Sequence, residues 1–323
     1  MNRRAVLSLI GGASLLPIAA RAQQKPMPVI GYLSPLSKEA ETTTGFLAGL
    51  AGEGFVVGRN LAIEYRFADG HPDRLSPLAT ELARLPVAVL VASGAGAAVA
   101  AKEATSTIPI VFGSGPDPVQ LGLVANLASP GGNATGVTLF STEVGPKRLE
   151  LLREILPQPG TIAFVVDPRM PGTAPQIREV EAAAQRLGQP VLVLQGGSDD
   201  EVEKALATMS ERQARGLIFG PSTYFQMIAD KLIALVARHR IPAMYEWPEF
   251  VAAGGLMSYS ADRNETSRLV GDYVGRILKG AAPAGLPVVR STRFRLVINL
   301  KTASTLGLTV PQSLLERADE VIE

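Results

Sequence analysis

Cysteine is absent from the 323-residue chain. This absence excludes disulfide bonds, thiol nucleophiles, sulfur-held metal ions and a lipid-modified N-terminal cysteine. Histidine is scarce as well: His71 lies in a Gly-His-Pro turn, and His239 stands between two arginines at an expected helix end. Neither histidine has a metal-type partner at short spacing, so we expect no metal site and no cofactor.

A charge excess of one sign is also missing. Lys and Arg number 31 and Asp and Glu number 30, which leaves a formal net charge of +1. This balance favours neither nucleic acid nor an anionic membrane surface as a partner. Beyond the N-terminal segment, no apolar run approaches the roughly 18 residues that a membrane-spanning helix needs. We therefore expect no membrane span there.

The N-terminus has the pattern of a targeting segment. Arg3 and Arg4 supply positive charge, Ala5–Ala20 is apolar but short, and Ala20-Arg-Ala22 fits a small-x-small cleavage site. We expect residues 1–22 to be a signal peptide that is cleaved after Ala22, and the mature protein to be periplasmic. The paired arginines leave the twin-arginine and the general export routes both open, and an uncleaved anchor is the alternative reading.

Strand-like and helix-like stretches alternate along the rest of the chain, and the pattern occurs twice. The expected strands are Pro28–Leu33, Leu61–Phe67, Val87–Ala92, Ile108–Phe112 and Thr135–Phe140, then Thr161–Asp167, Pro190–Gln195, Gly216–Gly220, Ile241–Tyr245, Gly254–Ser260 and Phe294–Asn299. The expected helical stretches include Glu39–Glu53, Val119–Leu127, Ala261–Lys279 and Pro311–Val321. This order predicts an α/β fold with two doubly wound parallel sheets.

One stretch, Ile108–Val137, organises the first unit. An apolar strand ends in Gly113-Ser-Gly-Pro-Asp-Pro118, which cannot continue a strand because its glycines permit unusual backbone angles and its prolines lack amide donors. Open α/β sheets bind ligands at such strand ends. Ser114 and Asp117 are the polar groups presented there, although Asp117 could instead close an Asx turn on its own backbone.

The same stretch carries a resemblance to a known family. The string I-P-I-V-F…D-P-V…G-L-V…L-A-x-P-G-G-N-x-T-G-V, together with Val29–Ser34, Lys147–Leu152 and Val297–Ala303, resembles the ABC-transporter substrate-binding proteins of the tryptophan/tyrosine-binding type. The resemblance implies the type I periplasmic-binding fold, with two lobes joined by a three-segment hinge near residues 140, 261 and 291. It implies lobes of residues 23–140 plus 261–290 and 141–260 plus 291–323.

Residues that follow the strand ends are expected to face a cleft between the lobes. The candidate ligand-binding residues are Ser34, Ser93, Gly94, Ser114, Asp117 and Ser141 in the first unit, and Ser222, Thr223, Tyr245, Glu246 and Trp247 in the second. Hydroxyls, aromatic rings and a few carboxylates suit a small polar or zwitterionic ligand.

Several of these residues have a plain structural reading beside the functional one. Ser93 and Gly94 precede a helix whose amides could hold a carboxylate, or they simply cap it. Ser222 and Thr223 either contact the ligand or cap a helix. Glu246 either pairs with an ammonium, as resemblance to amino-acid-binding proteins of this fold implies, or is solvated, and Trp247 either covers the ligand or packs.

We therefore expect an extracytoplasmic solute-binding protein of an ABC import system, not an enzyme. It would bind an amino-acid-like or aromatic carboxylate by hinge closure, act as a monomer, and deliver its ligand to an ABC permease in the inner membrane. One alternative is an exported ligand sensor for a membrane receptor. Another is an exported hydrolase that uses Ser114 and Asp117, but no histidine base is placed to serve it.

Overall fold

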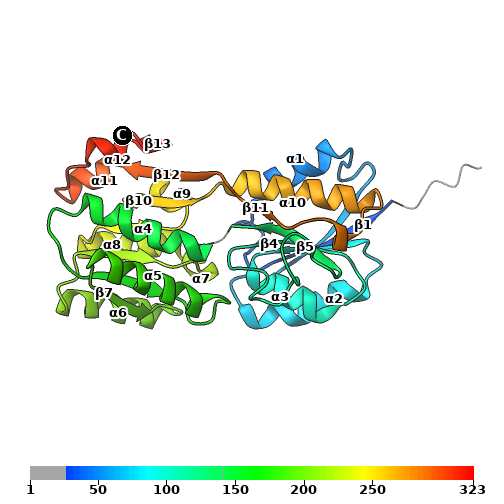
Figure 1. Cartoon of the computed structure of the whole chain (residues 1–323), viewed down its shortest axis with the longest axis horizontal. Coiled ribbons are helices and arrows are strands. Elements are labelled where there is room, and N and C mark those ends of the chain that lie inside the picture. The colour runs from blue at the N-terminus through cyan, green and yellow to red at the C-terminus, as the bar shows by residue number, and fades with distance from the viewer. Residues whose placement is uncertain (1–26, 140) are drawn as a thin grey trace, which may run out of the picture.

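The computed structural model describes residues 27–139 and 141–323, apart from the side chains of residues 141–143. The predicted signal peptide and its cleavage after Ala22 lie outside the described residues. Figure 1 shows two lobes side by side, each built on one β-sheet with helices against it. In the part of the chain that is described, none of the helices has the length and hydrophobicity that crossing a membrane requires.

The first lobe contains a six-stranded sheet in which every neighbouring pair is parallel. Its strands, in spatial order, are β11 (Val289–Arg290), β5 (Ala134–Thr138), β4 (Ile110–Ser114), β3 (Val89–Ser93), β1 (Val29–Ser34) and β2 (Ala62–Phe67). Its helices are α1 (Thr44–Gly52), α2 (Leu75–Arg84), α3 (Ala95–Ala104) and α10 (Arg263–Leu278), with short 3-10 turns at Pro72–Arg74 and Pro283–Gly285.

Alternate residues of the strands bury opposite faces of this first sheet. Leu90 and Ala92 of β3 pack with α2 and α3, whereas Val89 and Val91 pack with α1 and α10. This alternation follows from the two-residue period of a strand, and it accounts for the continuously apolar sequence of strands that are covered on both faces.

The second lobe contains a seven-stranded sheet that is mainly parallel. Its strands, in spatial order, are β13 (Glu320–Ile322), β12 (Phe294–Asn299), β10 (Met257–Ala261), β9 (Ala243–Tyr245), β8 (Gly216–Phe219), β6 (Ile162–Val166) and β7 (Val191–Gln195). Its helices are α4 (Ser141–Ile155), α5 (Thr173–Leu187), α6 (Asp199–Glu211), α7 (Thr223–Met227), α8 (Ala229–His239), α9 (Pro248–Ala252), α11 (Leu300–Thr305) and α12 (Gln312–Leu315).

The chain passes between the two sheets three times, in the order β5 to α4, β10 to α10, and β11 to β12. The predicted fold class, two doubly wound α/β lobes of the type I periplasmic-binding architecture, is therefore confirmed. The second and third passages are tied together, because the Asp262 N–H donates to the Arg293 carbonyl at 2.9 Å. The carboxylate of Asp262 also lies 3.8 Å from the Arg293 guanidinium.

Three local predictions differ from the structure. The first helix begins at Thr44 instead of Glu39, residues 119–127 form turns instead of a helix, and the C-terminal residues 320–322 form a strand. In addition, β12 runs antiparallel to β10, which the sequence pattern does not reveal. The first difference matters most for function, because it places Glu41 on a loop at the end of β1.

Candidate functional site

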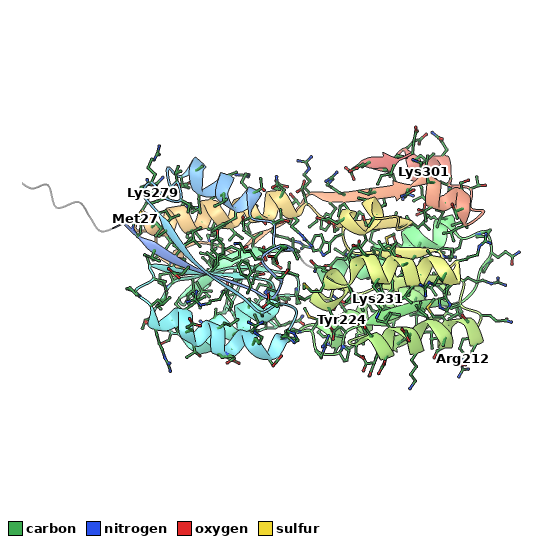
Figure 2. The ribbon with its side chains drawn as sticks, turned by 180° about the vertical axis from the view of Figure 1, so that it is seen from behind. Met27, Arg212, Tyr224, Lys231, Lys279 and Lys301 are labelled. Atoms are coloured by element: carbon green, nitrogen blue, oxygen red, sulfur yellow. The ribbon has the colours of Figure 1, made fainter. Side chains whose placement is uncertain are left out.

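A cavity of about 160 Å³ lies between the two lobes. The first lobe contributes the loops after β1, β3 and β4, the second contributes the loops after β6, β8 and β9, and the start of α10 completes the wall. Strand ends of both sheets therefore meet at one opening, as expected for ligand sites in open α/β sheets. Tyr224, which follows β8, lies at the end of the second lobe that faces the first lobe, and Arg212 lies at the opposite end (Figure 2).

The two lobes are in contact on either side of this cavity. A Cβ atom added to Gly172 of the second lobe would lie 2.5 Å from Cγ of Pro116 in the first lobe. A Cβ atom added to Gly70 would lie 3.1 Å from Cγ of Met227 in α7. These close approaches show that the lobes have come together around the cavity.

Glu41 forms the charged part of the first-lobe wall, and neutral hydroxyl groups surround its carboxylate. Tyr32 donates a hydrogen bond to Oε1 at 2.9 Å, and Ser93 donates to the same oxygen at 3.5 Å. Ser34 donates to Oε2 and accepts the backbone N–H of Leu36 at 3.1 Å. Among the described residues, Glu41 has no ion-pair partner, so its negative charge is held by hydroxyls alone.

The charge of Glu41 acts on the tyrosines beside it. Burial raises the pKa of Tyr32 well above its usual value, and the negative charge of Glu41 raises it further. Burial and Glu41 raise the pKa of Tyr65 in the same way. Tyr32 also packs edge-to-face on Phe46, with ring centroids 5.2 Å apart, and both rings line the cavity. This wall therefore combines an anion with aromatic surface.

Trp247 and Arg263 form the opposite side of the cavity. The guanidinium carbon of Arg263 lies 3.9 Å from the centroid of the Trp247 ring, and its Nη2 donates to Oε1 of Gln226 at 2.9 Å. Arg263 is the first residue of α10, and Asp262 caps that helix by accepting the N–H groups of Asn264 and Glu265. The cap fixes where the helix begins and therefore where Arg263 points.

Glu246 precedes Trp247 and is almost fully buried, with 7% of its surface exposed. Burial raises the pKa of its carboxyl, while the positive charges of Arg148 and Arg263 oppose that rise. Arg148 is itself 2% exposed, and its Nε donates to the Tyr259 carbonyl at 2.8 Å. Glu246 thus lines the cavity as a buried carboxyl group that two arginine charges attract.

The indole N–H of Trp247 is buried and makes no hydrogen bond of normal geometry within the described part of the chain. It still lies close enough to Glu246 to help lower the pKa of that carboxyl. Since a buried donor without a partner costs free energy, this N–H is available to a bound molecule.

Asp167 supports the second-lobe wall from behind. Its Oδ1 accepts the Arg169 Nε–H at 2.9 Å, and its Oδ2 accepts the Ser222 hydroxyl and the Arg169 Nη2–H, each also at 2.9 Å. Burial would raise the pKa of Asp167, but these hydrogen bonds outweigh it and the pKa is lowered. Ser222 also caps α7 by accepting the N–H groups of Tyr224 and Phe225. Ser222 is therefore both a cap and a cavity residue.

Gly94 lies at the start of α3 and borders the cavity. Its φ of 86° and ψ of 162° belong to a region that essentially only glycine occupies. This conformation turns the chain from β3 directly into α3. The amides of the first turn of a helix have no intrahelical acceptor, so this end of α3 presents donors and a positive dipole to the cavity.

The predicted site residues fall into two groups in the structure. Those that line the cavity are Ser93, Gly94, Ser222, Thr223, Glu246 and Trp247. Their role in ligand binding stays a prediction. Ser141 is the first residue of α4, and its side chain lies outside the described residues.

The structure places the other predicted site residues away from the cavity surface. Ser34 is fully buried and holds Glu41, and Ser114 donates to the Pro116 carbonyl at 3.2 Å. Asp117 accepts the Val119 N–H at 2.9 Å, which is the Asx-type turn. Tyr245 is the last residue of β9, but its ring stacks on Phe219 and Phe250 in the core. None of these four residues borders the cavity, and a role for them in ligand binding stays a prediction.

Sequence reasoning missed several residues that the cavity brings together: Tyr32, Glu41, Gln226 and Arg263. The predicted helix Glu39–Glu53 includes Glu41, whereas α1 begins at Thr44, and Arg263 lies within the predicted helix Ala261–Lys279, whose pattern does not single it out. In the described ranges, no cluster of three or more His, Asp or Glu side chains is arranged to hold a metal ion.

The comparisons with known proteins agree with this geometry. Residues 30–322 match the family model described as ABC transporter substrate binding protein. The chain belongs to this family. Members of the ABC transporter substrate-binding family are extracytoplasmic proteins that bind small molecules and have a membrane transporter as partner. The family and the fold are those of solute-binding proteins.

Individual relatives narrow the resemblance. A tyrosine-binding protein of Clostridioides difficile (strain R20291) is 24% identical over 273 residues, which are 82% of this chain and 76% of that protein. A conserved domain protein from Vibrio cholerae O1 biovar eltor is 27% identical with a TM-score of 0.85, and covers 91% of this chain and 99% of its own. An ABC domain in complex with L-Trp from Streptococcus pneumoniae is 25% identical with a TM-score of 0.84, at the same coverage. The predicted resemblance to the tryptophan/tyrosine-binding type is confirmed.

Proposed function

We propose that this protein is the periplasmic solute-binding component of an ABC import system and that its ligand is an aromatic amino acid or a closely similar aromatic carboxylate. One observation carries the proposal. A single cavity between the lobes combines aromatic rings with both signs of charge, namely the carboxylate of Glu41 and the guanidinium of Arg263. Ligand sites of this kind bury an apolar body and use a few placed polar groups for orientation.

The aromatic part of the proposal is supported by the lining and by the relatives. Tyr32, Phe46 and Trp247 all border the cavity, so a ring inserted there would meet aromatic surface on both sides. The C. difficile relative is a tyrosine-binding protein, and the S. pneumoniae structure contains L-Trp. A carboxylate on the ligand would find Arg263, the Trp247 N–H or the first amides of α3 as donors.

We further propose that ligand binding closes the lobes about the three crossings. The moving units would be residues 23–140 plus 261–290 and residues 141–260 plus 291–323, in line with the sheet to which each strand belongs. Arg263 begins a helix of the first lobe but contacts Trp247 and Gln226 of the second lobe, so closure brings groups of both lobes onto one ligand. A ligand stabilises the closed state because only that state offers it both walls.

The cellular setting is also a proposal. The N-terminal pattern supports export with cleavage after Ala22, by the twin-arginine or the general route, and the family supports delivery of the ligand to an ABC permease in the inner membrane. We propose that the mature protein acts as a monomer, since one chain supplies both walls of the cavity.

Titration calorimetry of the mature chain against the proteinogenic amino acids and a set of aromatic acids tests the ligand class. We expect saturable binding of tyrosine, tryptophan or phenylalanine. Small-angle X-ray scattering of the same samples should show a smaller radius of gyration with the ligand than without it. Binding of aliphatic amino acids or sugars with no response to any aromatic compound would overturn the ligand class, and an unchanged radius would overturn hinge closure.

A further inference from the structure

We propose that Glu41 binds the ammonium group of the ligand, so that the cavity selects free amino acids over the corresponding deaminated carboxylates. This inference rests on the proposed function, which by itself leaves open whether the ligand carries an amine. It assigns the selection to the first lobe and to a residue that is separate from Glu246.

The hydrogen bonds of Glu41 leave room for one more donor. An ionised carboxylate offers about four acceptor positions. Three are engaged, by Tyr32 and Ser93 at Oε1 and by Ser34 at Oε2. The Ser93 contact is long, at 3.5 Å, and Glu41 borders the cavity. A donor that enters the cavity therefore meets a carboxylate oxygen with unused acceptor capacity.

The charge of Glu41 is also uncompensated. All three partners are neutral hydroxyls, and in the described residues no Lys, Arg or His lies within ion-pair distance of its carboxylate. A buried or half-buried charge is most stable beside an opposite charge that also donates hydrogen bonds. A primary ammonium supplies both the charge and up to three N–H donors, which no neutral ligand group does.

Glu246, the other carboxylate on the cavity surface, differs in this respect. The charges of Arg148 and Arg263 already act on it. An ammonium placed there would have to compete with the positive charges of two arginines. The preference for Glu41 thus follows from the arginine charges that act on Glu246, whereas the described contacts of Glu41 are neutral hydroxyls.

Ser34 makes the arrangement rigid. Its hydroxyl accepts the Leu36 N–H at 3.1 Å and so directs its own proton toward Glu41. Ser34 is fully buried, and Tyr32 is fixed by ring contacts with Phe46 and Tyr65. Because its donors are held in place before a ligand arrives, little ordering is needed when an ammonium binds.

The test compares L-tyrosine with 3-(4-hydroxyphenyl)propanoate, and L-tryptophan with 3-(indol-3-yl)propanoate, by titration calorimetry on the full mature chain. The wild type should bind each amino acid at least about tenfold more tightly than its deaminated partner, as expected for a charge-assisted hydrogen bond. Glu41→Gln should reduce this ratio to within about twofold by weakening the amino acid alone. Glu39→Gln removes the same charge from an exposed position of the same loop and should keep the wild-type ratio.

The outcomes separate this inference from the proposed function. Equal binding of amino acid and deaminated acid by the wild type would overturn the role of Glu41 while the aromatic ligand class stands. No binding of either member of either pair would overturn both. If the preference for the amino acid over its deaminated partner persists in Glu41→Gln but is lost in Glu246→Gln, the ammonium binds to Glu246 in the second lobe. If Glu41→Gln shows no cooperative unfolding transition by circular dichroism, it is not folded and Glu41→Asp takes its place. Glu41→Asp keeps the charge, so it must still bind the amino acid more tightly than the deaminated acid.

Discussion

The guanidinium of Arg263 lies 3.9 Å from the centre of the Trp247 ring, although the two residues belong to different lobes. Trp247 follows β9 of the second sheet, and Arg263 opens α10, which packs on the first sheet. The contact therefore exists only when the lobes are together. A planar guanidinium stacked on an indole gains cation–π attraction, and this gain is larger where water is excluded.

Replacing Arg263 by Met should weaken ligand binding by roughly tenfold or more, because the change removes both the stacked cation and the hydrogen bond to Gln226. Titration calorimetry measures the loss directly. Trp247 is the only tryptophan of the chain, so its fluorescence emission provides a second readout of the same site.

The matched control for this change is Arg268→Met. Arg268 lies on the same helix and pairs with Asp272 at 2.7 Å, with about half of its side chain exposed. We expect wild-type affinity and an unchanged emission spectrum for this variant. Equal affinities for the two variants would show that the stacked arginine takes no part in binding.

Much of the fold was predictable from the sequence, and the reason lies in the buried strands. β3 and β6 are apolar on both faces, and each is followed by a turn and a helical period, which is the pattern of a parallel α/β sheet. The direction of β12 was not predictable in this way, because an antiparallel and a parallel neighbour bury the same side chains. Tertiary pairing, and not local preference, sets that direction.

The site was predictable only in part, because a strand end fixes the position of the chain but not the direction of each side chain. Trp247 and Ser222 reach the cavity, whereas Tyr245, two residues before Trp247, points into the core. Glu41 was hidden for another reason. It lies seven residues beyond Ser34 on a loop whose path depends on the Ser34–Glu41 hydrogen bond itself, and no sequence period reveals such a contact.

Replacing Gly94 by Ala should lower both stability and affinity. At a φ of 86° and a ψ of 162° a Cβ-bearing residue is strained by about 1–3 kcal/mol, and relief of that strain would shift the first turn of α3 at the cavity. Gly58→Ala is the control, since Gly58 also has a positive φ, of 81°, but is exposed and lies away from the cavity. Both variants should unfold at a lower denaturant concentration than the wild type, but only Gly94→Ala should bind the ligand more weakly. If Gly94→Ala binds the ligand with wild-type affinity, the start of α3 does not contribute to ligand binding.

Asp167→Asn should destabilise the protein in a pH-dependent manner. The pKa of Asp167 is lowered in the folded state, because hydrogen bonds from Arg169 and Ser222 outweigh the effect of burial. Its carboxylate therefore contributes stability above the unfolded-state pKa of about 3.9, and this contribution is lost as pH falls through the folded value. We expect the variant to be less stable than the wild type by about 1–2 kcal/mol near neutral pH.

The difference in unfolding free energy between wild type and Asp167→Asn, measured by urea denaturation, should narrow as the pH falls below about 4. Asp199→Asn is a suitable comparison, since Asp199 pairs with Lys231 on the surface at 2.5 Å. Asp199 also accepts the Tyr224 hydroxyl, and the hydrogen bonds from Lys231 and Tyr224 lower its pKa. Because exposed ion pairs contribute little, the stability difference of that variant should be clearly smaller than that of Asp167→Asn at neutral pH. If the difference in unfolding free energy between wild type and Asp167→Asn stays constant down to a pH of about 2, the charge of Asp167 does not contribute the proposed stability.

The packing of α1 against α10 rests on glycines. A Cβ atom on Gly49 would lie 2.0 Å from the Arg268 carbonyl oxygen, so the two helix backbones touch at that point. Gly49→Ala must push the helices apart and should cost about 1–3 kcal/mol of unfolding free energy. Gly52, at the end of the same helix, has its nearest heavy atom 4.0 Å away from such a Cβ. Gly52→Ala should therefore leave stability unchanged or raise it, because alanine favours helix more than glycine does.

The same pair of variants tests whether this helix packing affects the ligand cavity. Phe46 of α1 and Val270 of α10 both border the cavity, so a separation of the two helices would widen the wall on which a ring is expected to rest. Gly49→Ala should thus bind an aromatic ligand more weakly even at temperatures where it is fully folded, while Gly52→Ala should bind as the wild type does. If Gly49→Ala is destabilised yet binds with unchanged affinity, the glycine contact serves the fold alone and the first-lobe wall is set by the strand ends.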